Sequence, residues 1–87
     1  MVEKSVTITN PVGLHVMPAT FFIQKANEFS SSIWMEKDDR KVNAKSLLGV
    51  LYMGVVCGTT IKLIADGPDE EEAVEQLTEL LNSGLGE

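Results

Sequence analysis

The chain has 87 residues, of which 44% are hydrophobic, and this is enough for one small core. Its formal net charge is −6 and it has no basic stripe to neutralise phosphates, which argues against direct binding of nucleic acid. No run of 18 apolar residues and no secretory signal is present, so we expect a single domain over residues 1–87, with no membrane insertion and a cytoplasmic location.

The N-terminal segment VEKSVTIT, residues 2–9, is predicted to be a strand. Apolar and polar side chains alternate along it, which is typical of a strand with one face on a core and one face in water. The segment NPVG, residues 10–13, then ends the strand, because Asn-Pro and Gly favour turns. The side chains expected to point inward are Val2, Val6 and Ile8.

A helix is predicted over residues 16–29. Pro18 is compatible with a helix only in the first turn, where its missing N–H would have had no partner. The helix is therefore expected to begin at or just after His15, the only histidine in the chain. Its apolar residues recur at spacings of three and four, which places on one face Ala19, Phe22, Ile23, Ala26 and Phe29.

Two short strands are predicted to form a β-hairpin around Asp38-Asp39. They are SSIWMEK, residues 31–37, and RKVNA, residues 40–44. Trp34 alternates out of phase with its two apolar neighbours in the first of these strands. We therefore place Trp34 on the less covered face of the sheet and give it no function.

Ser46 directly precedes the apolar run LLGVLYMG, residues 47–54, and is predicted to be the N-cap of a helix of two turns at most. So short a helix cannot turn all of its apolar side chains inward. We therefore expect an exposed apolar surface that binds a partner. The side chains in question are Leu47, Leu48, Val50, Leu51 and Met53.

The last strand is predicted at TTIKLIA, residues 59–65, and a helix follows it. Asp69 and Glu72 have the spacing of a capping box at the start of that helix. Residues 69–87 contain seven acidic residues and no Lys or Arg, whereas the rest of the chain has a net charge of +1. We interpret this acidity as a solvated helix face, with a binding tail as the alternative. The expected core residues of the helix are Ala73, Val74, Leu77, Leu80 and Leu81.

The element order is therefore β-α-β-β-α-β-α. We predict an α/β (α+β) fold, an open-faced β-sandwich in which one face of a four-stranded antiparallel sheet is covered by helices. The other face of the sheet is expected to point toward solvent.

His15 is the residue with the clearest chemical potential. Imidazole titrates near neutral pH, so an unprotonated nitrogen is available to attack phosphorus. A helix N-terminus offers free N–H groups and partial positive charge to hold the resulting phosphoryl group. From the residues alone, the alternative is a surface or capping histidine in a loop rich in Gly and Pro.

Ser46 and Cys57 each have a simple structural interpretation. Ser46 needs no role beyond capping, but a phosphate at a helix N-terminus is also favourable and would add charge beside the apolar surface. Cys57 is expected at the core or its boundary. One histidine and one cysteine do not make up a zinc site, so neither a metal nor another cofactor is expected.

Two motifs resemble one known family over essentially all 87 residues. GLHVMPAT resembles the active-site segment of HPr, the histidine-containing phosphocarrier of the bacterial sugar phosphotransferase system. KVNAKSLLGVL resembles the regulatory-serine segment of HPr from low-GC Gram-positive bacteria. The resemblance implies a monomeric carrier, not a stand-alone catalyst.

The resemblance also implies partners and roles for particular residues. His15 would accept a phosphoryl group from phosphorylated enzyme I through Nδ1 and pass it to enzyme IIA domains of sugar permeases. HPr kinase/phosphorylase would phosphorylate Ser46, and that form would act as corepressor with the catabolite control protein. The backbone of Val16 and Met17 would hold the phosphoryl group. Partners would dock on Met17, Thr20, Leu47, Leu48 and Leu51.

Met17 departs from the family pattern. The family motif reads His-Ala-Arg-Pro, and this chain reads His-Val-Met-Pro over residues 15–18. An arginine would offer its guanidinium to the phosphoryl group, and methionine does not. Three interpretations stay open: a carrier with slowed transfer, a regulatory paralogue acting mainly through phosphorylated Ser46, and an adaptor domain that uses neither phosphorylation. A known HPr-like regulator lacks the histidine, which this chain keeps.

Overall fold

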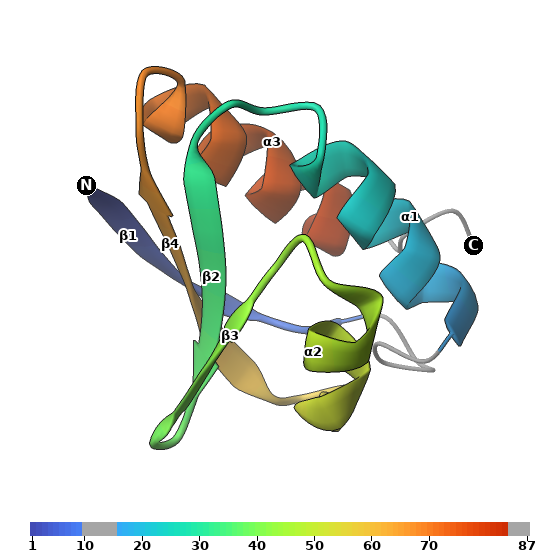
Figure 1. The fold of residues 1–87 in the computed structure, drawn as a ribbon. Coiled ribbons are helices and arrows are strands. Elements are labelled where there is room, and N and C mark those ends of the chain that lie inside the picture. The colour runs from blue at the N-terminus through green and yellow to red at the C-terminus, as the bar shows by residue number, and fades with distance from the viewer. Residues whose placement is uncertain (10–15, 84–87) are drawn as a thin grey trace.

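The computed structural model describes residues 1–9 and 16–83, and for Val16 and Met17 it describes the backbone alone. The predicted element order is confirmed (Figure 1). The elements are β1 Val2–Thr7, α1 Val16–Ala26, β2 Ser32–Lys37, β3 Arg40–Asn43, α2 Leu47–Tyr52, β4 Thr60–Asp66 and α3 Glu70–Asn82.

The four strands form one antiparallel sheet in the order β1-β4-β2-β3. The helices α1 and α3 lie side by side on one face of this sheet, and α2 packs beside β3 and α1 (Figure 1). The predicted open-faced sandwich is therefore confirmed. The turn between β2 and β3 is at Asp38-Asp39 as expected, with Asp38 at φ +56°.

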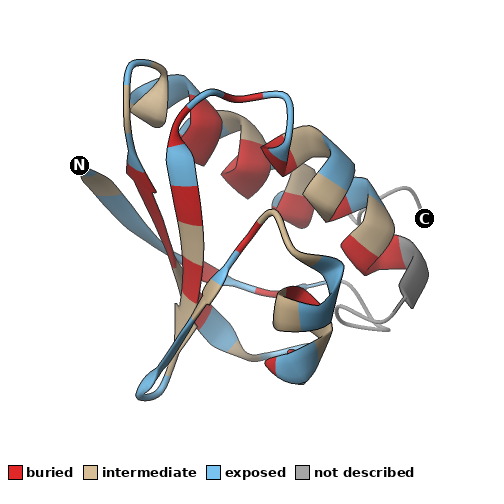
Figure 2. Cartoon of the chain, in the orientation of Figure 1, coloured by how far each residue is buried: buried red, intermediate tan, exposed pale blue. Residues whose placement is uncertain are grey.

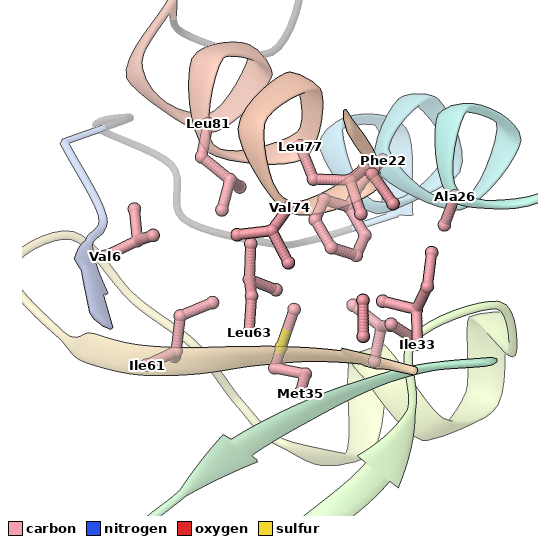
Figure 3. Packing of buried hydrophobic residues seen from close by; sticks show 14 of the residues in the cluster. Val6, Phe22, Ala26, Ile33, Met35, Ile61, Leu63, Val74, Leu77 and Leu81 are labelled. Atoms are coloured by element: carbon pink, nitrogen blue, oxygen red, sulfur yellow. The ribbon is translucent and has the colours of Figure 1, made fainter. Parts of the chain in front are cut away.

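The core lies between the sheet and the two long helices (Figure 3). Phe22 from α1 and Leu77 from α3 meet Met35 and Leu63 from the central strands, and all four side chains are inaccessible to water. The helix α1 ends at Ala26, three residues earlier than predicted. Phe29 is still buried, because Glu28 and Phe29 donate backbone hydrogen bonds three residues back and so continue the turn toward the core.

The open face of the sheet carries polar and aromatic side chains that are partly exposed to solvent. Trp34 lies on this face as predicted, paired with Ile64 of β4, and the Lys41 Nζ is 4.9 Å from the centroid of its ring. Lys62 lies 3.5 Å from Glu3 and 3.7 Å from Glu36. Ile64 is consequently buried although it faces away from the main core, which strand alternation did not predict.

The predicted capping box at α3 is wrong. Asp69 occupies the N-cap position, but its side chain makes no capping hydrogen bond. Its carboxylate instead accepts from the backbone N–H of Ser30 at 2.8 Å, from the N–H of Ser31 at 2.9 Å and from the Ser31 hydroxyl. Glu72 accepts from Gln76 Nε2 at 2.7 Å. The loop before β2 supplies three donors at once, which outweighs the single local capping bond.

Replacing Asp69 by asparagine is expected to lower the stability of the fold at neutral pH. The replacement is also expected to make stability depend less on pH in acid. The Ser31 hydroxyl and the Ser30 N–H hold the pKa of Asp69 below the ordinary value of 3.8. The ionised carboxylate therefore stabilises the fold fully above about pH 3.8, and this contribution is lost as the pH falls through the lowered pKa. Thermal unfolding between pH 2 and 7 measures the effect. Glu75→Gln, which removes an exposed carboxylate from α3, is the control and is expected to keep the acid dependence of the parent.

Thr78→Val is expected to raise the free energy of unfolding by about 1 kcal/mol. Thr78 is 7% exposed, and within the described part of the chain its Oγ1 has no hydrogen-bond partner. Valine keeps the branched shape and removes the unpaired hydroxyl. Urea unfolding measures the change, and Thr78→Ser, which keeps the hydroxyl and removes the methyl group, is expected to destabilise. A destabilised valine variant would show that the hydroxyl is satisfied in solution.

Cys57 is exposed, so its expected place at the core or its boundary is wrong. Of residues 55–57 in the turn after α2, only Val55 faces the core, while Val56 and Cys57 point outward. The Cys57 Sγ lies 3.8 Å from the carbonyl oxygen of Thr9. Among residues 1–9 and 16–83, no group of three His, Cys, Asp or Glu side chains is placed to hold a metal ion. Nor does this part of the chain contain a helix long and apolar enough to cross a membrane.

Candidate phosphorylation sites and docking face

His15 lies outside the described residues, but the helix that follows it is described. The helix α1 begins at Val16, directly after the histidine in the chain, as the sequence predicted. Pro18 is in the first turn, where it removes no intrahelical hydrogen bond, and it is buried. The first turn of an α-helix leaves its N–H groups without an intrahelical partner, and in α1 these groups include those of Val16 and Met17 and present partial positive charge.

Ser46 is the N-cap of α2, as predicted. Its backbone is extended, with φ −106° and ψ 122°, and its Oγ accepts a hydrogen bond from Gly49 N at 3.2 Å. The Ser46 carbonyl oxygen accepts the first intrahelical bond, from Val50 N at 3.0 Å. The serine hydroxyl therefore stands at the positive end of a helix dipole, where a phosphate would be stabilised.

The apolar residues of α2 divide between the core and the surface, as its length predicted. Val50 and Met53 are buried, and Leu51 is partly buried against the core. Leu47 and Leu48 are exposed, at 38% and 80%. Leu47 and Leu48 are thus confirmed as exposed, whereas Leu51 contributes less surface than its expected docking role implied.

The surface extends beyond the leucines that the sequence pattern selected. Tyr52 at the end of α2 and Val56 in the following turn are also exposed, and so is Phe21 on α1. Figure 2 shows exposed segments both in α2 and in the turn that follows it. Thr20 is half-buried on α1, which packs against α2. The pattern missed Tyr52 because only the leucines, Val50 and Met53 of the run 47–54 were assigned to the exposed surface, and it missed Val56 because that residue follows the run.

The C-terminal end of α2 is held by the β2–β3 hairpin. Lys37 Nζ donates to the carbonyl oxygen of Met53 at 3.2 Å and lies 3.5 Å from that of Gly54. Gly54 has φ +61°, a conformation in which glycine ends a helix without strain. The Arg40 guanidinium lies 5.5 Å from the centroid of the Tyr52 ring. Serine and lysine contacts thus fix the two ends of this short helix.

The fold and the two helix termini define a class of protein, a small open-faced sandwich with a histidine directly before one helix and a serine capping another. Residues 2–83 match the family model of the HPr component of the phosphotransferase system, a model described by its phosphorylation site. The chain therefore belongs to the HPr family, and the resemblance seen in the sequence is confirmed.

Relatives of two kinds match most of the chain. The HPr-like protein Crh of Halalkalibacterium halodurans is 49% identical over 77 residues, which is 88% of this chain and 92% of the relative. The phosphocarrier protein HPr of Neisseria meningitidis is 41% identical over 87 residues, covering 100% and 98%. The crystal structure of HPr from Thermoanaerobacter tengcongensis superposes with a TM-score of 0.97 at 50% identity, covering 100% of this chain and 98% of the other.

Proposed function

We propose that this chain is a phosphoryl carrier of the phosphoenolpyruvate-dependent sugar phosphotransferase system. His15 accepts the phosphoryl group from phosphorylated enzyme I and passes it to enzyme IIA domains of sugar permeases. The observation that carries the proposal is that α1 begins at the residue after the only histidine, in a chain of the HPr family.

The proposed chemistry uses the imidazole of His15 and the N-terminus of α1. The unprotonated Nδ1 of His15 attacks phosphorus, the new N–P bond forms, and the bond from phosphorus to the donor breaks. The negative oxygens of the transferred group then face the free N–H groups at the start of α1, with Val16 and Met17 as the holding residues. In the transfer to enzyme IIA, the N–P bond at His15 breaks and the acceptor group of enzyme IIA forms the new bond to phosphorus.

The second phosphorylation acts at Ser46. HPr kinase/phosphorylase modifies its hydroxyl, and the product acts as corepressor with the catabolite control protein. The N-cap position supports this role, because the added charge lies at the start of α2 beside exposed Leu47 and Leu48. A phosphate there changes the surface that partners meet on α2.

A regulatory paralogue is the second candidate function. It is favoured by Met17, which replaces the family arginine, and by the 49% identity to an HPr-like protein named Crh. In this alternative, His15 transfers poorly and Ser46 carries most of the function. The two candidates differ in the rate at which His15 receives and donates phosphate.

The carrier role is tested by incubating the chain with labelled phosphoenolpyruvate and its cognate enzyme I. Acid-labile label is expected on the parent and is expected to be absent from the His15→Ala variant. No label on the parent after long incubation, with enzyme I active on another HPr, would exclude the carrier role.

Ser46→Ala is expected to abolish the acid-stable label that the cognate kinase transfers from ATP. Ser32→Ala, which removes an exposed serine on β2, is the matched control and is expected to be labelled like the parent. Tandem mass spectrometry locates the phosphate. Undiminished acid-stable label on the Ser46→Ala protein would contradict the assignment.

We also propose that the resting protein is a cytoplasmic monomer, as the family resemblance implies. HPr from Thermoanaerobacter tengcongensis is known as a dimer as well, in a structure that matches this chain with a TM-score of 0.80. Light scattering across a concentration series tests the state of this chain, and a stable dimer at micromolar concentration would overturn the monomer proposal.

A further inference from the structure

The exposed apolar surface of α2 runs the full length of the helix. Leu48 in the first turn is 80% exposed, and Tyr52 at the last position is 69% exposed. These residues are four positions apart, so they lie on the same side of the helix. Val56, in the turn that follows, is 53% exposed. The surface therefore continues from the Ser46 end of α2 to its C-terminal end.

A cation from another element borders that C-terminal end. Arg40, at the start of β3, lies over the Tyr52 ring at 5.5 Å from its centroid. Asp38 and Asp39 precede it in the turn, yet within residues 1–9 and 16–83 Arg40 forms an ion pair with neither of them nor with any other carboxylate. A guanidinium that covers a ring keeps in-plane N–H donors for a further acceptor.

Charge is distributed unevenly between α3 and the surface of α2. The exposed side of α3 is acidic and carries Glu71, Glu72, Glu75 and Glu79. Figure 1 shows α3 separated from α2 by α1, so the acids lie away from the α2 surface. A partner surface that carries carboxylates is therefore repelled at α3, whereas the hairpin beside α2 carries mixed charge, with Arg40 as the cation that lies over the Tyr52 ring.

We propose that Arg40 and Tyr52 form one recognition element for a protein partner that presents a carboxylate beside an apolar socket. The Tyr52 ring enters the socket, and Arg40 pairs with the carboxylate through two N–H donors. The proposal rests on the proposed carrier function and adds a specificity-determining pair at the far end of the docking face. Its probe is the cognate enzyme I.

The first test is a calorimetric titration of the unphosphorylated chain into enzyme I. Arg40→Gln is expected to weaken binding roughly 5- to 50-fold and to reduce its dependence on salt. Lys41→Gln is the matched control, because it removes the same charge one residue later, where the side chain instead lies over Trp34 on the open face of the sheet. The control is expected to change the affinity less than about twofold. Thermal unfolding verifies that both variants are folded.

A double-mutant cycle with Tyr52→Ala tests whether the pair acts as one element. The double variant is expected to lose less affinity than the product of the two single losses. Equal effects of Arg40→Gln and Lys41→Gln, independent effects of Arg40 and Tyr52, or no binding by the parent would each overturn the proposal. The titration needs no phosphoryl transfer, so binding with the expected pattern but no label on His15 would overturn the carrier function alone.

Discussion

Gly67→Ala is expected to lower the free energy of unfolding by about 2–4 kcal/mol. Gly67 has φ +155°, and a β-carbon placed on it would lie 2.6 Å from the Cα of Ser31. The obstacle is backbone, which cannot rotate away as the end of a long side chain can. Relief requires the loop before β2 to move, and that loop supplies the donors that the Asp69 carboxylate accepts.

Gly58→Ala separates this clash from the conformational preference of glycine. Gly58 also has a positive φ, at +91°, but a β-carbon on it would meet nothing within 4 Å. Its replacement is expected to destabilise the protein by about 1 kcal/mol through backbone strain alone. Urea unfolding of both variants provides the comparison. Equal losses would show that strain accounts for the effect at Gly67, and that the Ser31 loop adapts freely.

Periodicity was sufficient for the element order because each element has its apolar face within a short stretch of chain. The alternation around Ile33 and Met35 and the helical spacing from Val74 to Leu81 each predict a buried face without reference to distant residues. The N-cap at Ser46 followed for the same reason, since the hydroxyl bonds to an N–H only three residues away.

The errors lie where residues far apart in the chain compete for the same group. Asp69 has the local spacing of a cap, but donors from residues 30 and 31 occupy its carboxylate. Ile64 is buried on the open face by the strands on either side of it, and Arg40 reaches Tyr52 through the hairpin. Such contacts depend on sheet order, which a single sequence does not state. The histidine site was predicted from its motif, and the structure adds the helix start behind it.

Met17→Arg is expected to raise the rate of phosphoryl transfer to enzyme IIA by about 30- to 1000-fold. This range corresponds to about 2–4 kcal/mol for one charge-assisted contact to the group in transfer. The backbone at position 17 belongs to the first turn of α1, which supplies the N–H groups proposed to hold the phosphoryl group. Arginine would add two directed donors to them, whereas methionine adds none.

Rapid-quench measurement of transfer from phosphorylated chain to enzyme IIA tests this expectation, with two further variants that separate charge from shape. Met17→Lys supplies the charge without the planar pair of donors and is expected to lie between the parent and the arginine variant. Met17→Leu keeps an apolar side chain and is expected to match the parent. A rate that stays constant or falls in Met17→Arg would mean that methionine is adapted to its partners, because the apolar contact then contributes more to transfer than the missing guanidinium. That outcome would count against the regulatory paralogue, in which the missing arginine is the reason for slow transfer from His15.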